Sequence, residues 1–196
     1  MVFDRSYKYF RIMKKVFLLS ISALLFISVT GLAQDVSKVK WYSIEEAEKL
    51  NKQQPRKIMI DVYTDWCGWC KKMDKETFNH PVIAKYLNEN YYPVKLDAES
   101  KEDIVFNGNT FKHVAQGARG YHELAAGLLN GKMSYPSVAY LNEKLELLGV
   151  IPGYLNAQKI EPLLNYIAEN KYTSESLQEY EKTFQSKLDG DKTTIN

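Results

Sequence analysis

The chain has 196 residues, of which 45% are hydrophobic, which is enough to build one ordinary globular core. Its 26 basic and 24 acidic residues give a formal net charge of +2, but five of the basic residues and one of the acidic residues lie within positions 1–33. The remainder carries 21 basic and 23 acidic residues, a net charge of −2, so the charge argues against a nucleic-acid partner.

The first predicted element is a secretory signal peptide over residues 1–33. Lys14-Lys15 precedes an apolar stretch over residues 16–29, and the small residues at 31–33 suit a signal peptidase. The stretch is shorter than the roughly 20 residues of a membrane-spanning helix, so an uncleaved anchor is the lesser alternative. Met13 is an alternative start of the signal. We therefore expect a periplasmic or secreted protein.

A helix and a buried strand are predicted next. Ser43 and Glu46 form a capping box that opens a helix running to about Gln53. Residues 57–63, KIMIDVY, are almost continuously apolar and predict a strand buried on both faces, as in a parallel sheet. Asp61 interrupts this run, so we expect a desolvated carboxylate with a raised pKa; the alternative is a side chain that reaches solvent at the strand end.

The only two cysteines, Cys67 and Cys70, stand in the sequence CGWC between this strand and a charged amphipathic run over residues 71–78 that predicts a helix. At a helix start, free backbone N–H groups and the helix dipole stabilise a thiolate and lower a cysteine pKa from about 8.5 to about 7 or below. Cys67 is therefore the expected nucleophile. Cys70, one turn later, is placed to resolve a mixed disulfide on Cys67. The spacing predicts a redox pair.

Half of a zinc site is the alternative interpretation of the two cysteines. It would need two of His80, His113 and His122, but these histidines are scattered, whereas zinc sites usually repeat the pair or cluster their histidines. His122-Glu123 begins like a zinc-protease helix motif, but Ala126 stands where the second histidine is required. We expect no metal.

Residues 60–71, IDVYTDWCGWCK, resemble the active-site segment of the thioredoxin superfamily, including Trp66 before the first cysteine and an aspartate six residues before it. The resemblance extends over about residues 41–170. It implies an α/β thioredoxin-like fold, with a central mixed β-sheet flanked by helices. It also implies a thiol–disulfide oxidoreductase that needs no cofactor, because the cysteines carry the electrons.

The residues around the cysteine pair have expected roles of their own. Asp61 suits a base that takes the proton from buried Cys70 as that thiol attacks. Trp66, Gly68 and Trp69 are expected to contact the client. Trp69 stands where many members have proline, and residues between the cysteines adjust the relative stability of dithiol and disulfide.

The connection between Asp97 and Tyr135, which follows the strand predicted over residues 91–96, is longer than a minimal thioredoxin needs. A helix that starts at Pro81 precedes the strand. In residues 104–111, Asn107-Gly108 between apolar runs predicts a tight hairpin, and a helix is expected over 120–129. This insertion of a hairpin and a helix is expected to be a surface elaboration that covers a sheet edge. The functional alternative is a flap near the cysteines that selects a partner.

Residues 134–141, SYPSVAYL, look like the cis-proline loop of the same superfamily. The resemblance implies that Pro136 is cis and packs beside the cysteine pair, and that Tyr135 offers its backbone to an extended client. From the residues alone, Pro136 is only a proline at the first position of a strand. A hairpin over residues 140–151 and a helix over 156–170 complete the predicted domain, residues 34–170.

The last segment, residues 171–196, is polar. Apolar residues at helical spacing predict a terminal helix packed on the domain, with a partner-binding helix as the lesser alternative; they are Leu177, Tyr180, Phe184 and Leu188. Residues 189–196 are expected to be disordered.

The chain is thus expected to be an exported thiol–disulfide oxidoreductase, with the reductase direction favoured. Its expected partners are disulfide-containing or dithiol client proteins, with a membrane protein as a candidate electron donor. The alternative from another class is a non-catalytic binding module of the same fold, which uses the cysteine pair for zinc or as a passive disulfide.

Overall fold

A computed structural model describes residues 38–117 and 119–188. The predicted signal peptide and the predicted disordered tail lie outside these residues. None of the helices in the described ranges is both long enough and apolar enough to cross a membrane.

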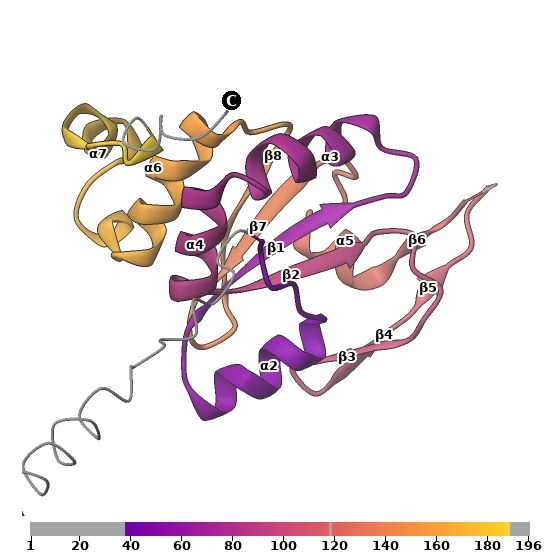
Figure 1. Cartoon of the computed structure of the whole chain (residues 1–196). Helices are drawn as coiled ribbons and strands as arrows, with labels where there is room; N and C mark the ends of the chain where they lie inside the picture. Colours follow the sequence, from indigo (N-terminus) through magenta and orange to yellow (C-terminus); the bar gives the residue numbers. More distant parts are fainter. Residues whose placement is uncertain (1–37, 118, 189–196) are drawn as a thin grey trace, which may run out of the picture. The chain divides into compact units, whose positions relative to one another are not determined.

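A four-stranded mixed sheet lies at the centre of the described domain (Figure 1). Its strand order is β2-β1-β7-β8, formed by Tyr91–Asp97, Lys57–Tyr63, Ser137–Leu141 and Leu147–Pro152. β1 is parallel to β2 and antiparallel to β7. β1 is therefore a central strand, which explains its long apolar sequence. The predicted α/β fold with a mixed sheet is confirmed.

Helices cover both faces of this sheet, as Figure 1 shows for α4 (Pro81–Asn90) and α6 (Ala157–Ala168) on one side and α2 (Ile44–Gln53) on the other. α5 (Glu123–Leu128) packs on the same face as α2. The capping box at the start of α2 is present as predicted. Two layers of helix around one sheet bury two apolar clusters, one on each face.

The alternation of side chains along β1 decides which residues face which helices. Ile58, Ile60 and Val62 belong to the cluster under α2 and α5, whereas Met59 belongs to the cluster under α4 and α6. Because successive side chains of a strand point to opposite faces, Asp61 lies on the Met59 face. Met73 of the helix that follows the cysteines is buried in the same cluster.

The cysteine motif lies at a helix start, as predicted, and the helix begins at Gly68, before the charged run over residues 71–78. α3 (Gly68–Met73) has Cys67 as its N-cap residue, and a π-helical turn, η1 (Asp74–Phe78), continues it. In this turn the Asn79 N–H donates to the Asp74 carbonyl oxygen over 3.1 Å, five residues back. The CGWC motif therefore occupies the first turn of a helical segment that extends to Phe78.

The insertion before β7 contains the predicted hairpin. β3 (Ile104–Phe106) and β4 (Asn109–Phe111) pair antiparallel around Asn107 and Gly108. These two turn residues have φ of 48° and 76°, the left-handed conformation that such a turn requires and that the Asn-Gly sequence favours.

The helix predicted over residues 120–129 forms, but its predicted start is wrong. Tyr121–His122 instead forms β6, which pairs with β5 (His113–Val114). α5 begins only at Glu123, because His122 is its N-cap and accepts a 3.2 Å hydrogen bond from the Leu124 N–H through Nδ1.

The C-terminal elements follow the prediction with shorter bounds. β8 begins at Leu147, because Leu145 lies in the preceding turn with φ of 65°. After α6, the short 3-10 helix η2 (Lys171–Thr173) leads to α7 (Leu177–Thr183). α7 packs on α6, and Tyr180 of α7 is buried. It ends before Leu188, because the backbone at Phe184 is extended.

Candidate active site

Cys67 and Cys70 are joined by a disulfide at the start of α3, with 5.3 Å between their Cα atoms. Both residues are largely buried, with 5% of Cys67 and 2% of Cys70 exposed. The Cys70 backbone N–H donates to Cys67 Sγ over 3.1 Å. In the reduced protein, the same N–H would stabilise a thiolate on Cys67, because a hydrogen bond to the charged form favours it. The geometry thus agrees with Cys67 as the nucleophile.

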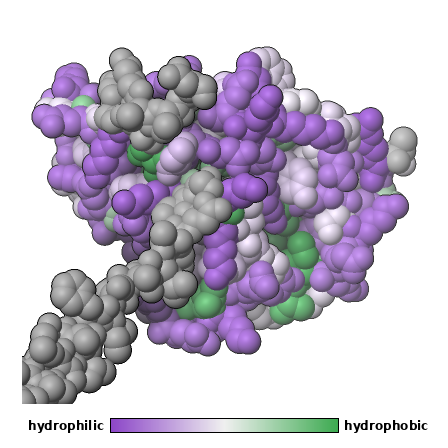
Figure 2. Space-filling model, viewed as in Figure 1, coloured by the Kyte–Doolittle hydropathy of each residue, from purple (hydrophilic) through white to green (hydrophobic). Residues whose placement is uncertain are grey.

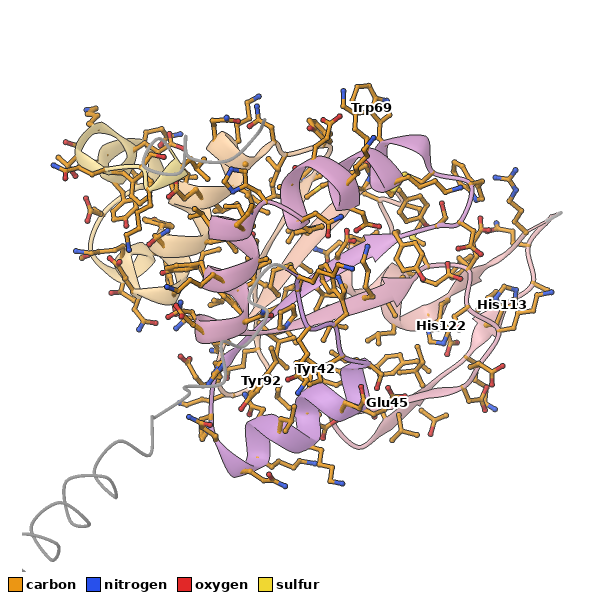
Figure 3. The ribbon with its side chains drawn as sticks, in the orientation of Figure 1. Tyr42, Glu45, Trp69, Tyr92, His113 and His122 are labelled. Atoms are coloured by element: carbon orange, nitrogen blue, oxygen red, sulfur yellow. A yellow bond between two sulfur atoms is a disulfide. The ribbon has the colours of Figure 1, made fainter. Side chains whose placement is uncertain are left out.

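Two tryptophans are exposed around this disulfide. Trp66 is 52% exposed and Trp69 is 58% exposed. In Figure 3, Trp69 projects away from the body of the domain. Gly68, between them in sequence, is open as well, since a Cβ atom there would meet nothing within 4 Å. Figure 2 shows a mostly hydrophilic surface on the face it draws, with only small hydrophobic areas. Among the described residues, the exposed large hydrophobic side chains are those of Trp66, Trp69, Val105 and Leu147, so two of the four adjoin the cysteine pair.

Trp66 contacts three side chains, those of Tyr135, Glu99 and Arg119. Its ring packs edge-on against Tyr135, with 6.1 Å between the ring centroids, and its Nε1–H donates to Glu99 Oε1 over 3.0 Å. The Arg119 guanidinium lies 4.5 Å from the centre of the indole, within the range of a cation–π contact. Burial, together with the charges of Glu99 and Asp97, raises the pKa of Tyr135 to about 12, so its phenol stays neutral.

Trp69 has a separate set of partners. Its ring tilts against Tyr154, with 5.3 Å between the centroids, and the Lys72 ammonium lies 5.1 Å from the Trp69 centroid and 5.6 Å from that of Tyr154. The Tyr154 hydroxyl donates to Glu76 Oε2 over 2.9 Å. Two aromatic groups, one around Trp66 and one around Trp69, thus adjoin the cysteine motif. Sequence reasoning missed Lys72, Glu99, Arg119 and Tyr154 in this role.

The Tyr135–Pro136 peptide bond is cis, which confirms the prediction made from the resemblance. Pro136 is buried, and its carbonyl oxygen accepts a 2.8 Å hydrogen bond from the Gly153 N–H. Within the described residues, no backbone hydrogen bond uses the N–H or the carbonyl of Tyr135. Because Tyr135 also contacts Trp66, this loop and its free backbone groups lie beside the motif.

Asp61 is 1% exposed, so the predicted burial is confirmed and the alternative of a solvated strand-end residue is wrong. Its Oδ2 accepts a 2.6 Å hydrogen bond from Lys95 Nζ, whereas its Oδ1 is buried and has no hydrogen-bond partner among the described residues. Burial outweighs the attraction of Lys95 and raises the pKa of Asp61 to about 6. Lys95 also forms an ion pair with Asp74.

Sequence reasoning missed Lys95. It lies directly beside Asp61, because the parallel register of β1 and β2 pairs the two positions. A lysine inside the otherwise apolar strand over residues 91–96 was the available signal, since a buried lysine needs a counter-charge.

The metal alternative finds no geometric support in residues 38–117 and 119–188. No group of three or more His, Cys, Asp or Glu side chains there is placed to hold a metal ion. His113 and His122 are partners across the β5–β6 pair and, in Figure 3, lie apart from Trp69 in the CGWC motif.

Comparison with known proteins places this site in a family context. The family model Thioredox_DsbH, described as a protein of unknown function, DUF255, matches residues 28–179. An uncharacterised protein of Archaeoglobus fulgidus is 31% identical over 81 residues, which are 41% of this chain and 64% of that protein. The thiol:disulfide interchange protein DsbD of Vibrio vulnificus is 38% identical over 58 residues, which are 28% of this chain but only 10% of DsbD.

A solved structure supports the fold. A thioredoxin-fold protein from Helicobacter pylori superimposes with a TM-score of 0.51 at 12% identity, covering 81% of this chain and 91% of the other. The family match spans most of the chain and includes the cysteine motif and the cis-proline loop. The chain therefore belongs to the Thioredox_DsbH (DUF255) family, within the thioredoxin superfamily.

Proposed function

We propose that this protein is a thiol–disulfide oxidoreductase that exchanges its Cys67/Cys70 pair with protein clients outside the cytoplasm. The observation that carries the proposal is the position of Cys67 at the start of α3. Its sulfur accepts a 3.1 Å hydrogen bond from the Cys70 N–H, and exposed tryptophans stand nearby in the sequence, Trp66 before Cys67 and Trp69 after it. The partial match to DsbD, named as a thiol:disulfide interchange protein, supports the same chemistry.

The reductase direction proceeds in two exchanges. The Cys67 thiolate attacks one sulfur of a client disulfide; the client S–S bond breaks, its other sulfur leaves as a thiolate, and a mixed disulfide forms. Cys70 then loses its proton and attacks Cys67 Sγ. This step forms the Cys67–Cys70 bond and releases the second client thiolate. Two electrons pass from the pair to the client, and a separate dithiol donor must restore the pair.

Asp61 is the proposed acceptor of the Cys70 proton. It lies on the sheet face that also buries Met73 of α3, and its Oδ1 is free of hydrogen bonds within the described residues. A pKa of about 6 leaves this carboxylate mostly ionised at neutral pH and more basic than an exposed aspartate. Both properties suit a general base for a thiol.

We propose that the two aromatic groups form the client-binding surface. A client segment that brings a cysteine to Cys67 has to pass Trp66, Trp69 and the open side of Gly68. The free backbone groups of Tyr135 offer main-chain hydrogen bonds to an extended segment, and stacking on the indoles adds affinity without demanding one client sequence.

Replacing Trp69 with alanine should therefore raise the KM for a disulfide-bonded peptide client about 5- to 20-fold, and Trp66→Ala should act similarly. The expected kcat change is smaller, because neither ring reacts. Val105→Ala is the matched control, since Val105 is also 52% exposed but lies on the β3–β4 hairpin. Equal kinetics for all three variants and the parent protein would remove the aromatic groups from client binding.

The reductase direction is tested by equilibrating the Cys67/Cys70 pair with glutathione. A potential near −270 mV, as in thioredoxin, would agree with a reductase, whereas about −180 to −120 mV would assign an isomerase or an oxidase. Turnover of a disulfide-bonded peptide, with excess dithiol as electron source, should exceed the uncatalysed exchange and vanish in Cys67→Ser.

The same measurements test the alternative of a binding module. A pair that binds client protein without accelerating exchange would be a passive disulfide, and zinc retained stoichiometrically by the reduced protein would assign a metal role.

A further inference from the structure

The Lys95 ammonium is shared by two carboxylates that differ in their exposure to solvent. It donates to Asp61 Oδ2 over 2.6 Å and forms a second ion pair with Asp74 Oδ1. The side chain of Asp61 is 1% exposed, that of Lys95 is 21% exposed and that of Asp74 is 42% exposed. The three groups therefore run from the buried face of β1 to the surface at η1.

Aromatic rings hold the ammonium in this place. Lys95 Nζ lies 4.9 Å from the ring centre of Trp41, 5.0 Å from that of Tyr63 and 5.8 Å from that of Phe78. Such cation–π contacts favour a cation at the ring faces, and the rings restrict where the side chain can move. Lys95 is therefore positioned between the carboxylates, and not free to turn wholly toward either.

The charged and titratable groups around Asp61 come from three elements. They are Lys95 on β2, Asp74 on η1 and the Tyr63 phenol on β1 itself. Lys95 also lines a cleft of about 290 Å³, and the acidic residues among its other lining residues are Glu45, Asp97, Glu102 and Asp103. Asp74 is the one carboxylate of the described residues that shares an ion-pair partner with Asp61.

We propose that Asp74 is a positioning residue, which divides the Lys95 ammonium between itself and Asp61 and so prevents the cation from fully neutralising the buried carboxylate. The proposal rests on the proposed function of Asp61. Two carboxylates around one ammonium leave a net charge of −1, so the cation neutralises Asp61 only in part. Burial is the largest cause that raises the pKa of Asp61, and repulsion from the charge of Asp74 adds to it. Without Asp74, the full field of Lys95 would act on Asp61 and weaken its hold on a proton.

Asp74→Asn is the first test, because it removes the charge and keeps an oxygen that can accept from Lys95. The direct readout is the carboxyl-carbon NMR titration of Asp61 in the oxidised protein, which needs no client and no turnover. We expect the midpoint to fall by about half a unit to one unit, and Asp74→Glu to restore it. Glu179→Gln is the matched control, since it removes an exposed carboxylate that pairs with Lys182 on α7 and should leave the midpoint in place. An unchanged or higher midpoint in Asp74→Asn overturns the proposal.

The second readout is the rate at which Cys70 resolves a preformed mixed disulfide on Cys67, measured across pH. In Asp74→Asn, the pH below which the resolution rate falls should move to a lower value, by the same amount as the NMR midpoint. A general loss of structure would not produce this shift. Asp61→Asn separates the two proposals. If Asp61→Asn leaves the profile unchanged, the base role of Asp61 is wrong. The NMR midpoint of Asp61 in Asp74→Asn then still tests whether Asp74 affects the protonation of Asp61. If Asp61→Asn removes this fall in rate but Asp74→Asn does not move it, the positioning role fails.

Discussion

Cys70→Ser should abolish multiple turnover and leave client proteins attached to Cys67 as mixed disulfides. Attack by Cys67 needs only its own thiolate, which keeps the N-cap position of α3 and the N–H of residue 70 as hydrogen-bond donor. Resolution needs a second sulfur, which serine does not supply. Non-reducing electrophoresis of the variant mixed with a disulfide-bonded client measures the trapped fraction, which should approach one client per chain.

Cys67→Ser is the control for this experiment. Cys70 is only 2% exposed and follows the N-cap, so it should trap little client on its own. Equal yields of mixed disulfide from the two variants would reverse the assignment of nucleophile and resolving cysteine.

Asp61→Asn should change the pH dependence of stability. The pKa of Asp61 is about 6 in the folded protein, because burial raises it from the ordinary aspartate value of 3.8, so the folded state holds more protons than the unfolded state between these pH values. The free energy of unfolding of the parent protein should therefore fall as pH rises through this window, by up to about 3 kcal/mol from this group. The variant lacks the group, so it should gain stability relative to the parent between about pH 4 and about pH 7.5.

Urea unfolding of both oxidised proteins at these two pH values measures the difference. The asparagine keeps an oxygen that can accept from Lys95, and a change in packing that does not depend on pH shifts the variant at both pH values and cancels in the comparison. The variant should also resolve a mixed disulfide about 100-fold more slowly near neutral pH, with the loss shrinking as pH rises and Cys70 ionises unaided. Parallel stability curves, together with parent-like resolution rates, would show that Asp61 neither carries the raised pKa nor acts as the base.

Local sequence patterns were enough to predict most of the elements. The capping box of α2, the Asn-Gly turn of the β3–β4 hairpin and the apolar strand β1 depend on residues close together in the chain, and the structure confirms all three. Their bounds hold because capping and turn chemistry act over three or four residues. The α5 start was predicted wrongly, since Tyr121–His122 pairs with a strand eight residues upstream that no local pattern reveals.

The sequence by itself determined the redox pair, its position at a helix start and, through the resemblance, the cis peptide at Pro136. The tertiary structure alone decided what surrounds that pair. Asp61 meets Lys95 because β1 and β2 pair in one particular register, and Lys95 meets Asp74 because the π-helical turn begins at that residue. Such contacts join residues 21 and 34 positions apart in the chain, and side-chain periodicity within a segment carries no information about the register between segments.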